Sequence, residues 1–310
     1  MIAQRYKDML SGKSVIRQIS EWSTARGTEI GYENVFDYSL GNPSVPCPEH
    51  FTKTCIDLLQ TKEPVTLHGY SPTLTIPAVR KAVAESLNRR FGMDYGMEHI
   101  FMATGAAGAL AHAMRCVAVP GQDIITFAPF FPEYKPYVEG AGLNLKVVPP
   151  RTKDFQIDFD AYDAMLDENT AAVLINTPNN PTGAVYSEQT LRALGELAVE
   201  HGFIIISDEI YEKMVYDGAE HISTASLSPE IYRHCITING FSKAYAMPGW
   251  RIGYSAAPLE VTTAIKAVQG HVTSAANSIA QKAALEALSG PQDTVAVMCG
   301  EYARRRSRVA

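Results

Sequence analysis

The chain has 310 residues, 46% of them hydrophobic and 19% charged, which fits one large domain with a smaller one. A formal net charge of -6 provides no basic field for nucleic acid or for an anionic membrane surface. The chain has no apolar run long enough for a bilayer span, no signal-peptide core and no metal-type cysteine spacing, so we expect a cytoplasmic protein without a metal site.

The first hundred residues contain few strong signals. Short helices are predicted at Ile2–Leu10 and Val15–Ile19, and an extended segment, Phe36–Leu40, is expected to end at the turn Gly41-Asn42-Pro43. A longer helix is predicted at about residues 76–90, with a proline in its first turn.

A strand followed by small residues begins at Ile100. The strand Ile100–Ala103 leads into Thr104-Gly105-Ala106-Ala107-Gly108 and then into an apolar helix that runs to about Ala118. Small residues at a helix start expose backbone N–H groups and the positive end of the helix dipole. This start can bind a phosphate group, or it can serve tight helix packing.

Two further strands are predicted to end in loops of unusual composition. The strand Asp123–Phe127 precedes an aromatic cluster at residues 130–134, of a kind that usually belongs to a core. After a helix at Asp158–Met165, the strand Ala171–Ile175 ends in Asn176-Thr177-Pro178-Asn179-Asn180-Pro181-Thr182-Gly183. Two prolines and a glycine around paired asparagines enforce a fixed loop that can aim one amide inward.

An acidic residue follows the next buried strand. The helix Glu188–Glu200 stops at a glycine, and Phe203–Ile206 is the continuous apolar run of a parallel strand covered on both faces. Asp208 comes directly after this strand, where ligands of α/β sheets bind. The alternative is a solvated turn.

The stretch 239–254 contains the strongest chemical signal. Lys243 follows the apolar strand Cys235–Ile238, and desolvation at such a position can lower the pKa of a lysine and free its amine for Schiff-base chemistry. The guanidinium of Arg251 suits a phosphate, and Gly249 and Gly253 are expected to let the backbone pass close to a ligand. The alternative is a solvated lysine and a surface arginine.

Helices are expected at Leu259–Val268, Ser278–Leu288 and about 293–306. Strands that alternate with helices predict an α/β fold with a mostly parallel sheet and short turns at its ligand-binding edge.

The stretch 239–254 resembles the lysine signature of class I/II aminotransferases, the pyridoxal phosphate (PLP) enzymes of the aspartate aminotransferase superfamily, and Asn180-Pro181-Thr182-Gly183 resembles their Asn-Pro-Thr-Gly motif. The resemblance covers about residues 15–310. It implies PLP as cofactor and fold type I, with an N-terminal arm and part of a small domain at 1–45 and a large cofactor domain at 46–285. Residues 286–310 would begin a smaller α+β domain that looks C-terminally incomplete.

The resemblance also implies a role for each matched residue. Lys243 would carry PLP as a Schiff base, Asp208 would pair with the pyridine nitrogen, and Tyr211 would complete the catalytic set beside the phenolic oxygen. The other implied cofactor contacts are Gly105, Ala106, Ala107, Ser242 and Arg251 around the phosphate, Phe131 stacked on the ring, and Asn180 at the phenolic oxygen.

The same resemblance implies a homodimer with shared active sites. Tyr70 would reach the partner's cofactor phosphate, although it could equally be an ordinary interface tyrosine, and Thr75 stands where relatives carry glycine. Gly41 and Asn180 would lie on the substrate side. The family's arginine for the substrate α-carboxylate has no counterpart here, so we expect either a fragment or a different mode of substrate binding.

The reaction implied is transamination between an L-amino acid and a 2-oxo acid. A PLP-dependent carbon–sulfur β-lyase and a non-catalytic PLP-binding protein are the alternatives, because one fold and one cofactor support several reactions. His271 is a candidate for binding a substrate side-chain carboxylate, or it is structural.

Overall fold

The computed structural model describes residues 2, 4, 7, 15–70 and 75–309, and the chain divides into two compact units, Met1–Ser44 and Val45–Ala310. In the first unit, the helix α2 (Val15–Ile30) extends well beyond the predicted piece, and the single turn η1 (Tyr32–Asn34) follows it. The predicted helix at residues 2–10 lies mostly outside the described residues. The segment 36–40 is irregular and forms no strand.

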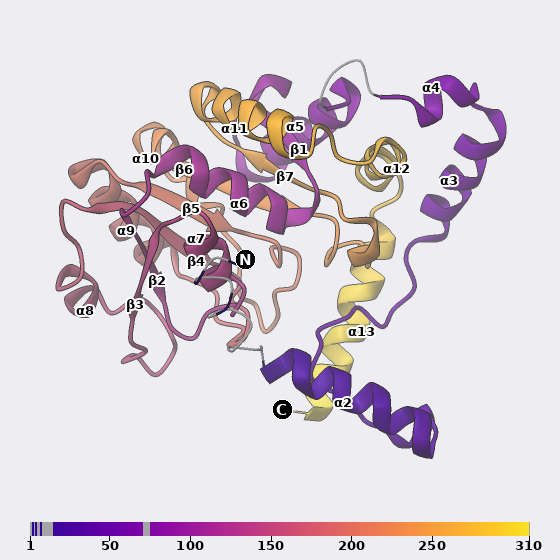
Figure 1. The fold of residues 1–310 in the computed structure, drawn as a ribbon, viewed down its shortest axis with the longest axis horizontal. Helices are drawn as coiled ribbons and strands as arrows, with labels where there is room; N and C mark the ends of the chain where they lie inside the picture. The colour runs from indigo at the N-terminus through magenta and orange to yellow at the C-terminus, as the bar shows by residue number, and fades with distance from the viewer. Residues whose placement is uncertain (1, 3, 5–6, 8–14, 71–74, 310) are drawn as a thin grey trace. The chain divides into compact units, whose positions relative to one another are not determined.

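The second unit is built on a seven-stranded sheet in the order β1-β7-β6-β5-β4-β2-β3 (Figure 1). The pairings of β7 with β1 and with β6 are antiparallel and the other four pairings of this sheet are parallel, so the predicted mostly parallel α/β sheet is confirmed. The strands are β1 (Ile100–Ala103), β2 (Asp123–Phe127), β3 (Asn144–Val148), β4 (Thr170–Asn176), β5 (Ile204–Asp208), β6 (Cys235–Gly240) and β7 (Gly253–Ala256).

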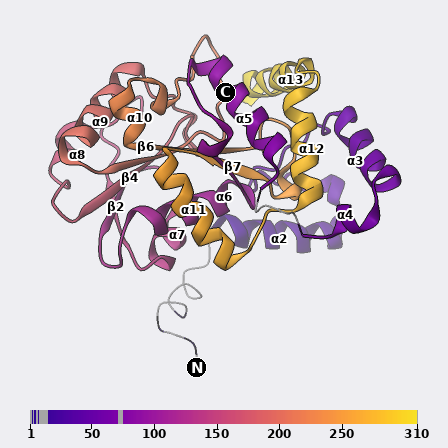
Figure 2. The ribbon, with the colours of Figure 1, turned by 90° about the horizontal axis from the view of Figure 1, so that it is seen from above.

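Helices cover both faces of this sheet, and Figure 2 shows α7 and α11 on one side of the strands and α9 and α10 on the other. The first face carries α6 (Gly105–Val117), α7 (Tyr134–Gly140) and α11 (Leu259–Val272). The opposite face carries α5 (Pro77–Phe91), α8 (Phe159–Asp163), α9 (Glu188–His201), α10 (Pro229–Arg233) and the turn η3 (Thr224–Ser226). Burial on both faces explains why the central strands are continuously apolar.

A further layer of helices packs beyond α5. The helix α12 (Ser278–Ser289) contacts α5, and α3 (Glu49–Thr61) and α4 (Pro64–His68) contact α12. The helix α13 (Asp293–Val309) completes this unit, together with the short turns η2 (Met97–His99) and η4 (Pro248–Trp250). Among the helices of residues 15–70 and 75–309, none is long and apolar enough to cross a membrane.

The register of the parallel strands aligns their carboxyl ends. Asn176 at the end of β4 pairs with Asp208 at the end of β5, and Asp208 pairs with Ile238 of β6. The loops after these strands therefore leave the sheet side by side, at the edge where the sequence places its candidate site residues.

Candidate active site

The residues predicted at three strand ends lie together at the carboxyl edge of the sheet. Asn180 Nδ2 donates a hydrogen bond to the hydroxyl of Tyr211 at 3.2 Å, and Lys243 Nζ lies 5.8 Å from the centre of the Tyr211 ring. The backbone N–H of Asn180 donates to Asn176 Oδ1 at 2.7 Å, and Asn176 Nδ2 donates to the carbonyl of Asp208 at 2.8 Å. One hydrogen-bonded chain thus links the loops after β4 and β5.

Asp208 is a buried carboxylate whose hydrogen-bond donors are neutral. It accepts bonds from the hydroxyl of Tyr134 at 2.7 Å and from the backbone N–H of Ile210 at 3.2 Å. Burial raises the pKa of Asp208 to about 6, the negative charge of Glu209 adds to this, and the bond from Tyr134 and the charge of Lys243 oppose it. Such a carboxylate gains from a positively charged N–H partner supplied by a ligand.

The pKa of Lys243 is shifted downward, opposite to that of Asp208. Burial and the nearby charge of Arg251 lower the pKa of its amine, and Asp208 opposes this shift. A larger share of the amine is therefore neutral than for a solvated lysine, and only the neutral amine is a nucleophile or a base.

The start of helix α6 and the guanidinium of Arg251 form the positive end of the site. Gly105 has φ +72, and a Cβ atom added to it would lie 2.5 Å from Arg251 Nη2, so the guanidinium rests directly against this residue. Thr104, at the helix N-cap, makes no side-chain capping bond, and Ala106 and Ala107 in the first turn are half-buried. A helix start with small residues and an adjacent arginine is suited to bind an anion.

Gly253 allows a strand and a helix start to pack closely. A Cβ atom at Gly253 would lie 2.5 Å from the backbone N of Ala106, so the absent side chain lets β7 approach helix α6. At Gly249 a Cβ atom would meet nothing within 4 Å. Close packing of strand against helix start explains the glycine at 253.

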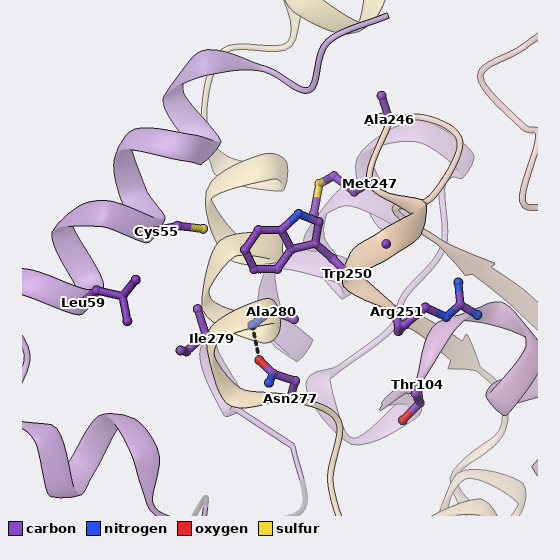
Figure 3. A pocket seen from close by; sticks show the side chains of 11 residues that line it. Cys55, Leu59, Thr104, Ala246, Met247, Trp250, Arg251, Asn277, Ile279 and Ala280 are labelled. Carbon is purple, nitrogen blue, oxygen red and sulfur yellow. Dashed lines mark hydrogen bonds between the residues drawn. The ribbon is translucent and has the colours of Figure 1, made fainter. Parts of the chain in front are cut away.

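A cavity of about 730 Å³ adjoins the positive end of the site, and Figure 3 shows Arg251, Thr104 and Trp250 on its wall. It reaches Arg251 but neither Lys243 nor Asp208, so it lies beside the reactive groups rather than around them. Its lining residues are Cys55 and Leu59 of α3, Thr104, Ala246, Met247, Gly249, Trp250 and Arg251, and Asn277, Ile279 and Ala280 at the start of α12.

Two further predicted contacts lie next to these groups in the chain or in space. Phe131 is half-buried and packs edge-on against Tyr134, with ring centroids 5.6 Å apart, which places it beside the residue that binds Asp208. Ser242 is buried and directly precedes Lys243.

Two candidates, Tyr70 and His271, are not brought into this cluster, and a third belongs to the other unit. Tyr70 follows α4 and is 94% exposed, and Thr75 is buried at 3% exposure. Gly41 belongs to the other unit of the chain, Met1–Ser44. His271 is exposed in the last turn of α11.

Two residues of the site were missed by sequence reasoning, Tyr134 and Asn176. Tyr134 is 1% exposed, and its hydroxyl reaches Asp208 across 74 positions of sequence, so only the tertiary fold reveals the contact. Asn176 left a weaker signal, because a buried polar residue at the end of an apolar strand requires partners.

Comparisons with known proteins identify the family of the chain. The model of the family "Aminotransferase class I and II" matches residues 33–310. The aspartate aminotransferase of Geobacillus stearothermophilus is 35% identical over 282 residues, 91% of this chain and 71% of that protein. A probable aspartate/prephenate aminotransferase of Thermus aquaticus is 36% identical over 313 residues, 98% of this chain and 77% of that protein.

Solved structures give the same result. The aspartate aminotransferase of Rhizobium meliloti superposes with a TM-score of 0.91 at 32% identity, covering 100% of this chain and 76% of that chain. That of Thermotoga maritima has a TM-score of 0.91 at 32% identity and covers 99% and 79%. By sequence and by fold, the chain belongs to the class I and II aminotransferases.

Proposed function

We propose that Lys243 is the residue through which this aminotransferase carries PLP and moves an amino group from an L-amino acid to a 2-oxo acid. The observation that carries the proposal is the opposite shift of two neighbours at one sheet edge. The pKa of Lys243 is lowered and that of Asp208 is raised, mainly by burial in both cases. Groups perturbed in this way are typical of catalytic sites.

The described residues fit PLP. Its phosphate matches the start of α6 and Arg251, where the missing Cβ of Gly105 leaves room for the guanidinium. Its protonated ring nitrogen would pair with Asp208, and its phenolic oxygen would accept hydrogen bonds from Asn180 and Tyr211. Phe131 would stack on its ring, and Ser242 would bind its phosphate. When bound, PLP supplies an electron sink for cleavage of bonds at the substrate Cα.

The protein's own part in the reaction is binding and proton transfer. As a general base, the neutral amine of Lys243 can accept the proton from the substrate Cα at Nζ. The protonated amine can then donate a proton as a general acid. Asn180 Nδ2 holds the Tyr211 hydroxyl at 3.2 Å, which fixes the direction of that donor. Asn180 and Gly41 are the proposed contacts to the substrate.

Amino-group transfer is favoured over the alternatives by the family match, whose relatives carry aminotransferase names. We propose L-aspartate as the first amino donor to test, because the relatives are named aspartate or aspartate/prephenate aminotransferases. The exposed His271 offers no sign of a buried carboxylate site.

We further propose a cytoplasmic homodimer in which Tyr70 completes the partner's phosphate site. The exposure of Tyr70, 94%, and of apolar side chains on α3 and α4 supports an uncovered contact surface, with Ile56 at 50%, Leu59 at 56% and Val65 at 77% exposure. The proposed cofactor domain, 46–285, contains every proposed cofactor contact. The cytoplasmic location rests on composition.

An absorbance scan of the purified chain with and without PLP tests the proposal, alongside Lys243→Ala. We expect a visible absorbance band with PLP that the variant lacks. Addition of an amino acid should reduce this band, and turnover should require a 2-oxo acid acceptor. Turnover without an acceptor would indicate elimination instead. A band that persists unchanged in Lys243→Ala would reject Lys243 as the attachment site.

A further inference from the structure

The turn after β5 points its side chains in two directions. Asp208 and Tyr211 face the site, where they meet Tyr134 and Asn180. Glu209 and Glu212 face the opposite side of the sheet. Neighbouring residues at a strand end point to opposite faces of the sheet. Contacts of Glu209 and Glu212 on the far face can therefore fix the backbone that carries Asp208 and Tyr211.

Glu209 is the centre of a buried polar cluster on that far side. It is 0% exposed, and its Oε1 accepts hydrogen bonds from Ser207 Oγ at 3.0 Å, Ser223 Oγ at 3.2 Å and the backbone N–H of Thr224 at 3.1 Å. Its Oε2 lies 3.2 Å from Nε2 of His221. A buried carboxylate with this many donors is fixed in place.

The charges of the cluster balance when His221 is protonated. Burial opposes protonation of His221, but the bond to Glu209 and the negative charges of Glu209 and Glu212 together outweigh it, and the pKa of His221 is raised. Arg90 Nη1, at the end of α5, lies 2.7 Å from Glu212 Oε1, and Phe91 packs edge-on against the His221 ring at 5.7 Å. Two cations then face two carboxylates, which offsets much of the cost of burying them.

The cluster clamps the turn at both ends. Glu209 is tied to η3 and its N–H donates to the carbonyl of Ile238 at 2.8 Å, while Glu212 is tied to α5. The N–H of Glu212 donates to the carbonyl of Glu209 at 3.0 Å, which closes the turn. Tyr211 lies between the two clamped residues, and Asp208 directly precedes the first.

We propose that Glu209 and His221 are positioning residues, whose contact behind the sheet fixes the turn that aims Asp208 and Tyr211 at the cofactor. The inference rests on the roles proposed above for Asp208 and Tyr211. The pair touches neither cofactor nor substrate and acts only through the turn. A misplacement of about 1 Å at such a site can cost on the order of 100-fold in rate.

The test compares His221→Leu, which removes the donor to Glu209, with His221→Gln, which keeps an N–H donor. We expect His221→Leu to raise the Kd for PLP, measured by titrating cofactor-free protein, and to lower kcat roughly 10- to 100-fold with little change in the KM of the amino acid. We expect His221→Gln to keep the Kd for PLP and kcat close to the values of the unaltered protein.

Asp123→Asn is the matched control, because it alters another buried, paired carboxylate, at the start of β2. It should lower the melting temperature and leave the PLP Kd unchanged. The proposal is overturned if His221→Leu lowers only the melting temperature, if Asp123→Asn weakens PLP binding equally, or if His221→Gln rescues nothing. If His221→Leu does not fold, Glu209→Gln replaces it, with the same expected increase in Kd. Failure of the unaltered protein to bind PLP would instead reject the proposed function.

Discussion

Two aspartate–lysine pairs stand at different edges of the same sheet, and their charges are held in different ways. At the amino end of β2, Lys146 Nζ lies 2.7 Å from Asp123 and 2.7 Å from Asp167. Burial opposes ionisation of Asp123, but the bonds from Lys146, Asn144 and Asn169 and the charge of Lys146 together outweigh it, and the pKa of Asp123 is lowered. The bonds to Asp123 and Asp167 raise the pKa of Lys146. Both groups are stabilised in their charged forms.

At the carboxyl edge both shifts have the opposite sign. The pKa of Asp208 is raised to about 6 and that of Lys243 is lowered, with burial as the largest cause for each. Here burial outweighs the interactions that favour the charged form of each group, which costs stability. The comparison teaches that at the first edge the interactions with neighbouring groups outweigh the cost of burial, while at the second edge burial prevails and shifts both groups toward their neutral forms.

The largest contrast is expected from removal of the two lysines. Lys243→Ala should lower transamination by at least about 10³-fold, because it removes the proposed nucleophile and base. Lys146→Ala should lower the melting temperature, because Asp123 and Asp167 lose their cation, while kcat stays close to that of the unaltered protein. Steady-state kinetics and thermal unfolding of both variants measure this. Equal losses of activity would remove the distinction between the edges.

Replacing the two aspartates should change stability in opposite directions. At pH 7, Asp208→Asn should stabilise the cofactor-free protein by on the order of 2–3 kcal/mol, because it removes a carboxylate whose pKa rises from 3.8 to about 6 on folding. Asp123→Asn should destabilise it by roughly 1–2 kcal/mol through the lost ion pair. Denaturant unfolding of the cofactor-free proteins measures both.

The pH dependence of stability tests the direction of each of these two stability changes independently. The favourable contribution of Asp208 is present below pH 3.8 and is lost as pH rises to about 6, so the advantage of Asp208→Asn should grow across that range. The contribution of Asp123 is present above pH 3.8 and is lost as pH falls further, because its folded pKa is lowered. Parallel pH profiles for the two variants would contradict this account.

A smaller effect is expected at the positive end of the site. Gly105→Ala and Gly202→Ala both place a side chain at positive φ, +72 and +76, at a cost of about 1–2 kcal/mol each. Only at Gly105 would the new Cβ also meet Arg251, whereas at Gly202 nothing lies within 4 Å. We therefore expect Gly105→Ala alone to raise the Kd for PLP, by about tenfold. Equal affinity in both variants would show that the guanidinium does not hold the phosphate.

The sequence predicted those parts of the fold and site that depend on local pattern. Apolar runs ending in Asn176–Gly183, in Asp208 and before Lys243 mark three strand ends, and parallel strands bring such ends to one edge. The strand β3 was missed because its side chains are mostly half-exposed and include Lys146, so it lacks the continuous apolar run of a central strand. The helices α3 and α7 were also missed. For α7 the reason is that it is short and lies among turn residues.

The remaining parts depend on contacts between distant segments. Tyr134 contacts Asp208 from helix α7, and His221 contacts Glu209 on the side of the sheet opposite the site. Neither contact leaves a periodic signal in the sequence. The sequence assigned no role to Glu209. Its burial is made possible by donors from distant residues, among them Ser223 Oγ and the backbone N–H of Thr224.

The reversed strand β7 sets a length for whatever binds at this edge. It lies between β1 and β6, so the carboxyl ends of these two strands, which precede the helix start and the lysine respectively, are separated by two strand spacings, about 9–10 Å. Inorganic phosphate is too short to bridge that interval, and a ligand that carries its phosphate on a ring is long enough. We infer that the spacing between β1 and β6 favours a ligand of the length of PLP over a free phosphate ion.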